Sequence, residues 1–193
     1  GAAAGNDAAL LNEAGAVAEE SGPDVWVGRL QAMMRVVEGA YSLTMLTNQG
    51  IFAARDPLGL RPLCLGEIEG GYVVASESCA LQTVGARFMR EVEPGEVLRL
   101  DQHGVTSTIT RHSGKRALCI FEHVYFARPD TMLEGQVIHE ARQRAGRQLA
   151  REAPAPADIV VPVPDSSTPA AIGYSLESGI PYTEGLIKNR YIG

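Results

Sequence analysis

The sequence has few cysteines and no long apolar run, and each shortage excludes a class of protein. Its three cysteines among 193 residues follow no metal-finger spacing, which argues against a disulfide framework and favours isolated reduced thiols. Every apolar run falls far short of the roughly 20 residues of a transmembrane helix, and no basic segment leads into an apolar one at the N-terminus. We therefore expect a cytoplasmic protein that does not cross a membrane.

An excess of basic residues is also missing. The 17 basic and 23 acidic side chains give a net charge of −6, so we do not expect a nucleic-acid-binding protein. The apolar share of 45% and the charged share of 21% are typical of globular chains that bury a core. Because the chain opens on Gly1 without a methionine and stops at Gly193 inside a basic and aromatic run, we expect a piece of a longer protein.

The first part of the chain, residues 1–113, shows helical and then strand periodicity. Apolar residues recur every three or four positions over 7–20 and again over 26–37, which predicts two amphipathic helices. Short apolar stretches separated by turn residues follow over 41–75, and a further pair flanks a turn within 96–110. These patterns predict an antiparallel meander and a hairpin, and therefore an α+β domain.

The second part, residues 114–193, begins near a polar and basic segment at 111–116, which is typical of a domain boundary. A long helix is predicted over 136–152. A strand, a helix and a second strand are then predicted over 158–161, 170–178 and 182–187. This order is typical of the start of a parallel sheet, so the predicted fold class is α+β followed by α/β.

The loop at 161–169 lies between the predicted strand and helix, where the carboxyl end of a parallel strand would place it above the sheet. Ser167 or Thr168 can cap the helix, and Pro169 suits its first turn. Backbone amides and the positive end of the helix dipole would then face a phosphate or pyrophosphate. The alternative is that these residues only cap the helix.

Two cations follow the next predicted strand. Lys188 and Arg190 would reach the same edge of the sheet, where they can neutralise the charge of a phosphate. A solvated basic patch is the alternative.

Five motifs follow one another along the chain. They are Asp56 to Leu63, Ala75 to Ala80, Glu91 to Glu96, Tyr125 to Asp130 and Gly185 to Tyr191. In this order they resemble the motifs of the glutamine phosphoribosylpyrophosphate amidotransferases. The first two alone are typical of the wider class of N-terminal-nucleophile glutamine amidotransferases, whereas the last two are far more specific. The resemblance covers nearly the whole chain after about Ala40.

The resemblance implies the C-terminal part of an N-terminal-nucleophile glutaminase domain, with αββα layers, followed by the start of a type I phosphoribosyltransferase domain with a parallel sheet. Such an enzyme forms 5-phosphoribosylamine, glutamate and pyrophosphate from glutamine and phosphoribosyl pyrophosphate, in the first committed step of de novo purine synthesis. The full-length protein would be a homo-oligomer. The alternatives are a catalytically inactive phosphate-binding homologue and another N-terminal-nucleophile amidotransferase.

The resemblance also implies that the nucleophile is missing from these residues. The family uses an N-terminal cysteine whose own α-amine acts as the base, and Gly1 occupies the first position here. Cys64, Cys79 and Cys119 have no free α-amine, so we expect the 193 residues alone to be inactive. Asp7 corresponds to the residue that binds the ammonium of glutamine, with helix capping as the alternative role.

In the transferase part, the resemblance assigns contacts to substrate and metal. The residues assigned to phosphoribosyl pyrophosphate are Asp165, Ser166, Ser167, Lys188, Arg190 and Tyr191. Ser167 also matches a position associated with Mg²⁺, which commonly bridges substrate phosphates. Lys188, Arg190 and Tyr191 would begin the loop that closes over the substrate and excludes water.

Near the start of the second domain, the resemblance implies a route for ammonia between two sites. Glu122, Tyr125 and Arg128, together with Phe126, would couple these sites, and an aromatic interdomain core is the alternative. Cys119 corresponds to one ligand of the four-iron, four-sulfur cluster that some members of the family carry, and such a cluster needs four thiolates.

Overall fold

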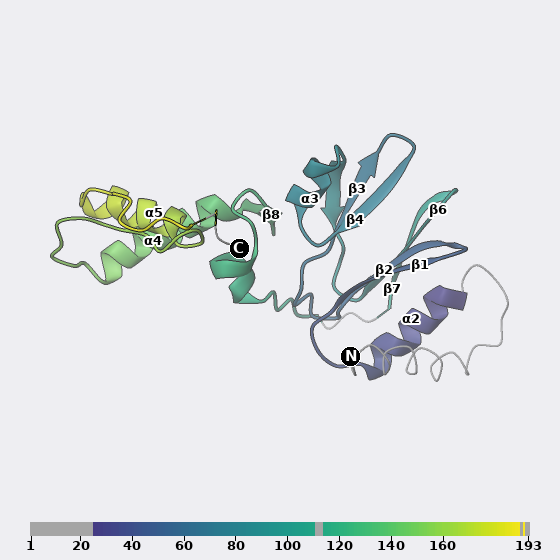
Figure 1. Ribbon diagram of the computed structural model, residues 1–193. Helices are drawn as coiled ribbons and strands as arrows, with labels where there is room; N and C mark the ends of the chain where they lie inside the picture. The colour runs from purple at the N-terminus through teal and green to yellow at the C-terminus, as the bar shows by residue number, and fades with distance from the viewer. Residues whose placement is uncertain (1–24, 111–113, 190, 192–193) are drawn as a thin grey trace. The chain divides into compact units, whose positions relative to one another are not determined.

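The computed structural model describes residues 25–110, 114–189 and 191 (Figure 1). Contacts within the chain divide it into two units, with the first ending at Leu118 and the second beginning at Cys119. The helix predicted over 7–20 lies outside the described residues. None of the described helices is both long enough and apolar enough to span a membrane.

The first unit contains a four-stranded antiparallel sheet, which we call sheet A. Its strands are β1 (Ser42–Thr47), β2 (Gly50–Arg55), β6 (Glu96–Asp101) and β7 (Gly104–Ile109), in the spatial order β1-β2-β6-β7. Helix α2 (Val25–Val36) covers one face of this sheet. The buried residues between them are Leu30, Met33, Met34, Phe52, Ala54 and Val97. The predicted helix over 26–37 and the predicted hairpin within 96–110 are confirmed.

A second sheet, sheet B, contains β3 (Cys64–Ile68), β4 (Gly71–Ala75) and β5 (Arg87–Glu91) in the order β4-β3-β5. The prediction of one continuous meander over 41–75 is therefore wrong, because β2 pairs with β1 and β6, and not with β3. Strand alternation shows which side chains are buried, but it does not specify the neighbouring strand. The short helix α3 (Ser78–Thr83) and strand β5 were not predicted.

These elements form four layers in the order α2, sheet A, sheet B, α3. Between the two sheets lie Ala53, Leu63, Leu65, Val92, Leu98 and Leu100. On the other face of sheet B, Leu81 of α3 packs with Cys64 and Ala86. Successive residues of a strand point to opposite faces, so Cys64 and Leu65 of β3 enter these two different cores. The predicted mixture of helix and sheet is confirmed.

The loop from Asp56 to Arg61 leads the chain from sheet A to sheet B, and buried polar groups hold it. The fully buried carboxylate of Asp56 accepts hydrogen bonds from the amides of Leu58 and Leu60 at 3.0 Å and from that of Arg61 at 3.2 Å. The neighbouring Arg55 guanidinium donates to the carbonyl of Gly59 at 3.2 Å and to that of Arg61 at 2.8 Å. The first motif of the chain therefore has a structural role in this unit.

An ion pair joins the two sheets. Arg90 of β5 donates two hydrogen bonds, at 2.8 and 2.7 Å, to the two carboxylate oxygens of Glu96 on β6. The Glu93 amide and the Ser107 hydroxyl also donate to this carboxylate. Burial by itself raises the pKa of Glu96, but the hydrogen bonds from Arg90, Ser107 and Glu93 outweigh it and hold the pKa below its usual value.

We expect replacement of Glu96 by glutamine to lower the free energy of unfolding by about 2 kcal/mol at pH 7. A carboxyl whose pKa is depressed by folding stabilises the protein above its unfolded pKa of 4.5, and this stabilisation is lost as the pH falls through the folded pKa. The difference between wild type and Glu96→Gln should therefore be constant above about pH 5 and shrink below about pH 4.5. Urea denaturation across pH 3 to 8 measures it.

The matched control is Glu140→Gln, because Glu140 is exposed and its oxygen is 4.0 Å from Arg144. It should change stability very little at any pH. A stability difference for Glu96→Gln that persisted unchanged at pH 3 would contradict the role assigned to this carboxylate.

The second unit contains two helices in close contact, α4 (Ile138–Glu152) and α5 (Thr168–Ser178). They follow the π-helical turn η1 (Glu122–Phe126) and the short strands β8 (Met132–Leu133) and β9 (Gln136–Val137). The helix predicted over 136–152 begins at Ile138, because the two residues before it pair with β8.

The two strands predicted at 158–161 and 182–187 are not regular strands. They are joined by one parallel bridge between Val160 and Tyr182. The Val160 amide donates to the Pro181 carbonyl at 2.8 Å, and the Thr183 amide donates to the Val160 carbonyl at 3.0 Å. The prediction of strands is therefore wrong for these segments, although they run parallel at the bridge as expected. Within the described part of this unit, no further strand lies beside them to extend the ladder.

Candidate phosphate site

The loop before α5 leaves two backbone amides available for an anion. Among the described residues, no group accepts a hydrogen bond from the amide of Ser166 or Ser167. Pro169 in the first turn has no amide hydrogen to offer. The N-terminus of the 11-residue helix α5 also carries a partial positive charge. Free amides and the helix dipole together favour a phosphate group at this end of the helix.

Ser167 occupies the N-cap position, but its side chain does not cap the helix. Its hydroxyl donates instead to the carbonyl of Val163 at 2.5 Å. The prediction that a serine or threonine side chain caps this helix is therefore wrong for Ser167. Because the hydroxyl proton is used in this bond, the oxygen keeps its lone pairs and can accept a hydrogen bond or bind a cation.

Lys188 is brought to this loop by the segment that follows the parallel bridge. Its ammonium nitrogen lies 3.6 Å from a carboxylate oxygen of Asp165, and both side chains are more than half exposed. A cavity of about 160 Å³ lies between the loop and this segment. Its lining residues are Pro162, Pro164, Asp165, Thr168, Tyr182, Glu184, Leu186, Ile187 and Lys188. The structure therefore brings together the loop and one of the two predicted cations.

The other predicted substrate residues that the structure describes do not line this cavity. Ser166 and Ser167 belong to the loop but are not among the lining residues. Tyr191 does not line it, and its side chain is almost fully exposed. Its amide donates to the side-chain oxygen of Asn189 at 2.9 Å. Asp7 and Arg190 lie outside the described residues.

Sequence reasoning missed Glu184, which is among the residues that line the same cavity. The signal that would have found it is the two-residue period of an extended segment. Tyr182, Glu184, Leu186 and Lys188 are alternate residues, and all four line the cavity. Since Lys188 was already expected at the loop, the same period would have placed Glu184 beside it.

The donor atoms of the loop are of the kind that suits Mg²⁺. Within the described ranges, no group of three or more histidine, cysteine or acidic side chains is placed to hold a metal ion. Mg²⁺ needs few protein ligands when substrate phosphates supply the others, and Asp165 and Ser167 present a carboxylate and a hydroxyl oxygen at the loop. Cys119 is half-buried, and its role as one of the four thiolate ligands of a cluster stays a prediction.

The three cysteines give no evidence of an activated nucleophile. Cys64 and Cys79 are buried, and Cys119 is half-buried. Burial, together with the nearby Glu91 carboxylate, raises the pKa of Cys64 to about 12. Since the thiolate is the nucleophilic form, Cys64 is unreactive at neutral pH.

The residues predicted to couple two sites differ in their surroundings. Glu122 is buried, whereas Tyr125 is 62% exposed and packs edge-on against Phe126. Arg128 forms an ion pair with Asp130 at 2.8 Å. Buried Arg142 of α4 holds the turn by donating to backbone carbonyls at both ends of it. The coupling role stays a prediction.

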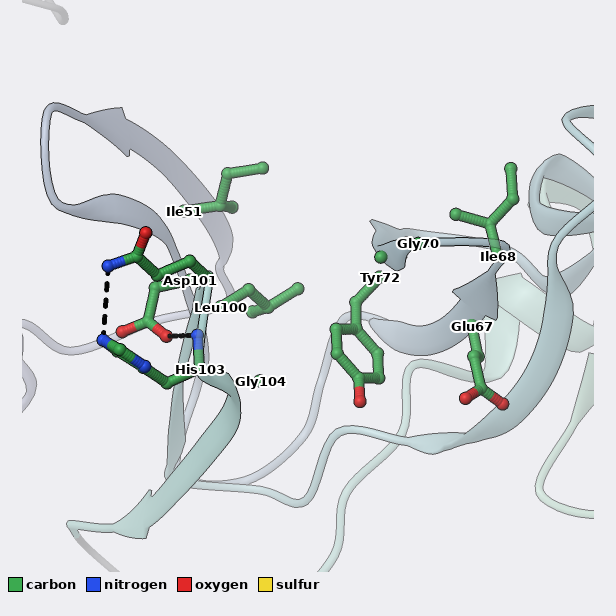
Figure 2. A pocket seen from close by; sticks show the side chains of 11 residues that line it. Ile51, Glu67, Ile68, Gly70, Tyr72, Leu100, Asp101, His103 and Gly104 are labelled. Atoms are coloured by element: carbon green, nitrogen blue, oxygen red, sulfur yellow. Dashed lines mark hydrogen bonds between the residues drawn. The ribbon is translucent and has the colours of Figure 1, made fainter.

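A larger cavity, of about 540 Å³, lies in the first unit between the β3–β4 and β6–β7 turns (Figure 2). Tyr72 lies on one side of it, and Asp101 and His103 lie on the other. Asp101 is already paired with Arg99 and accepts the His103 amide at 2.7 Å, and Glu67 is paired with Arg87. The smaller cavity borders the loop that carries two free amides and Lys188, which suit a phosphate group, so it is the better candidate for substrate chemistry.

Comparison with known proteins identifies relatives of this chain. No protein-family model matches the sequence. An amidophosphoribosyltransferase of Archaeoglobus fulgidus is 47% identical over 167 residues, which cover 86% of this chain and 36% of that protein. The Mycobacterium bovis amidophosphoribosyltransferase is 50% identical over 161 residues, which cover 83% of this chain and 30% of that protein. That of Rattus norvegicus is 46% identical over 193 aligned positions, covering 91% and 37%.

Solved structures give the same result. The glutamine phosphoribosylpyrophosphate amidotransferase of B. subtilis, complexed with ADP and GMP, matches with a TM-score of 0.87 and 41% identity, over 95% of this chain and 40% of that one. A structure described as the allosteric regulatory enzyme of purine biosynthesis matches with a TM-score of 0.88 and 41% identity. The match covers 97% of this chain and 40% of that one.

These comparisons show that the chain is similar in sequence and in fold to amidotransferases. More narrowly, the proteins it resembles are amidophosphoribosyltransferases, which confirms the resemblance inferred from its five motifs. The chain spans about a third of the length of the curated relatives that it matches.

Proposed function

We propose that this chain is part of an amidophosphoribosyltransferase and that the loop from Pro164 to Thr168 binds the pyrophosphate group of phosphoribosyl pyrophosphate. The observation that carries the proposal is the position of Lys188, 3.6 Å from Asp165 at a loop with two free amides. The names of the relatives support the same substrate. The whole enzyme would form phosphoribosylamine, glutamate and pyrophosphate, in de novo purine synthesis.

The two units would have different tasks in this enzyme. The four layers found in the first unit support the assignment of residues 1–113 to an N-terminal-nucleophile glutaminase domain that releases ammonia from glutamine. The helix pair, the parallel bridge and the loop support the assignment of residues 114–193 to the start of a type I phosphoribosyltransferase domain. The proposed site for glutamine includes Asp7. Homo-oligomeric assembly and a cytoplasmic location are further parts of this proposal.

The loop would act mainly on the leaving group. As the bond to the ribosyl carbon breaks, negative charge develops on pyrophosphate. The Ser166 and Ser167 amides and the Lys188 ammonium would stabilise that charge from fixed positions. Mg²⁺ would neutralise further phosphate charge when bound, and the Asp165 carboxylate and the Ser167 hydroxyl would hold it. Arg190 and Tyr191 would belong to the segment that closes over the substrate and excludes water.

Two alternatives make different predictions for this chain. A catalytically inactive homologue would bind phosphoribosyl pyrophosphate, but the complete reading frame would not hydrolyse glutamine. Another N-terminal-nucleophile amidotransferase would not bind phosphoribosyl pyrophosphate at all. We expect the 193 residues to bind phosphoribosyl pyrophosphate without turnover, and measurable glutamine hydrolysis by them would contradict this expectation.

We expect Lys188→Met to weaken binding of pyrophosphate about tenfold, because one charge-assisted contact to phosphate is worth about 1.4 kcal/mol. Isothermal titration calorimetry with pyrophosphate and with phosphoribosyl pyrophosphate, each with and without Mg²⁺, measures the effect. The matched control is Lys115→Met, because Lys115 is the other lysine of the chain and lies in the first unit. Equal affinity of Lys188→Met and wild type would overturn the assignment of this site.

A further inference from the structure

Gly185 lies against the side chain of Val161, at the point where the Lys188 segment passes the segment that leads into the phosphate loop. A Cβ atom on Gly185 would be 2.8 Å from Cγ1 and 3.2 Å from Cγ2 of Val161. The first distance is shorter than any normal carbon contact. Val161 is β-branched and stiff about its first side-chain bond, so a side chain at position 185 would push the two segments apart.

In the part of the chain that the structure describes, the segment of Val161 and the segment of Gly185 are joined by backbone hydrogen bonds before Gly185 but not after it. The bridge between Val160 and Tyr182 and its two backbone hydrogen bonds fix the segments next to each other just before Gly185. After Gly185, the chain continues through Leu186 and Ile187 to Lys188. Among the described residues, no backbone hydrogen bond holds residues 186–188. A displacement at position 185 would therefore be transmitted to Lys188 and not be absorbed at the bridge.

We propose that Gly185 is a positioning residue that acts through Lys188. Because it has no side chain, residues 182–188 can lie close to Val161, and the Lys188 ammonium then reaches the mouth of the loop, 3.6 Å from Asp165. This inference rests on the proposed function, since it assumes that the loop binds a phosphate group. It assigns a role to a residue that contacts neither the phosphate nor Asp165.

The test is a double-mutant cycle read out by pyrophosphate affinity. We expect Gly185→Ala to weaken binding roughly fivefold, whereas Val161→Ala should bind as tightly as wild type. The double variant Val161→Ala with Gly185→Ala should regain most of the lost affinity, because the methyl groups that meet the new Cβ are gone. In a Lys188→Met background, Gly185→Ala should cause no further loss.

Each outcome decides the proposal. Wild-type affinity of Gly185→Ala would overturn it, and so would a loss that is not recovered in the double variant or that persists in the Lys188→Met background. If neither the single nor the double variant folds, as judged by circular dichroism, Gly185 serves the fold as a whole and the positioning role is wrong. Failure of wild type to bind pyrophosphate would instead overturn the proposed function.

Discussion

Replacement of Gly146 by alanine is expected to lower the free energy of unfolding of the second unit by about 3 kcal/mol. In an ordinary helix the same change is stabilising by up to about 1 kcal/mol. Here, however, the new Cβ would be 1.9 Å from the carbonyl oxygen of Ala170 on the neighbouring helix. Likewise, a Cβ atom on Gly173 of α5 would be 2.0 Å from the carbonyl oxygen of Gln143 on α4. Because these two glycines have no side chain, the backbones of α4 and α5 can lie in direct contact.

Far-UV circular dichroism in urea measures this effect, because α4 and α5 are most of the helix in the second unit. Gly28→Ala is the matched control, since Gly28 lies in α2 and, among the described residues beyond the nearby backbone of its own helix, no atom lies within 4 Å of its Cβ position. It should raise stability by about 0.5 to 1 kcal/mol. Gly146→Ala with wild-type stability would show that the helices can separate at no cost and would contradict the close contact.

Asp56→Ala is expected to destabilise the first unit by about 3 to 5 kcal/mol. The carboxylate is fully buried and accepts three backbone amide hydrogens, from Leu58, Leu60 and Arg61. Alanine would leave these donors without an acceptor, and each unsatisfied buried donor costs about 1 to 3 kcal/mol. The loop joins the two sheets, so its loss would affect both cores.

Trp26, the only tryptophan of the chain, lies in α2 of the first unit, so its fluorescence in urea reports on this unit. Asp56→Asn should lose less stability than Asp56→Ala, because the amide oxygen can still accept from two of the three donors. Asp101→Ala is a second control, since among the described residues Asp101 accepts one backbone amide, that of His103. If Asp56→Ala lost no more stability than Asp101→Ala, the amide contacts of Asp56 would not be what holds the loop.

Local patterns predicted several elements of the fold correctly. Helix α2 follows from apolar residues spaced three and four apart, and the β6–β7 hairpin follows from alternation on either side of a turn. The end of α5 at Ser178 follows from Gly179, which adopts the left-handed conformation that ends many helices. Each of these signals acts between residues that are close in sequence.

The candidate site was predicted only in part. The loop before α5 and Lys188 were found from residue types and their place after predicted strands. Glu184 was not predicted, because a carboxylate is not a residue type that binds phosphate, although the period of two places it on the same side of the segment as Lys188. The use of the Ser167 hydroxyl was also missed, since a serine before a helix does not show whether its partner is an amide or the carbonyl of Val163.

Residue order along the chain therefore predicted helices α2, α4 and α5, the β6–β7 hairpin, the loop before α5 and the family that this chain resembles. The division of the strands into two sheets, the Arg90–Glu96 link between them and the approach of Lys188 to Asp165 became known only from the folded chain. The physical reason for this division is that periodicity shows only which side of a helix or strand is buried. Strand partners and the contact of Gly185 with Val161 depend instead on packing between segments far apart in sequence.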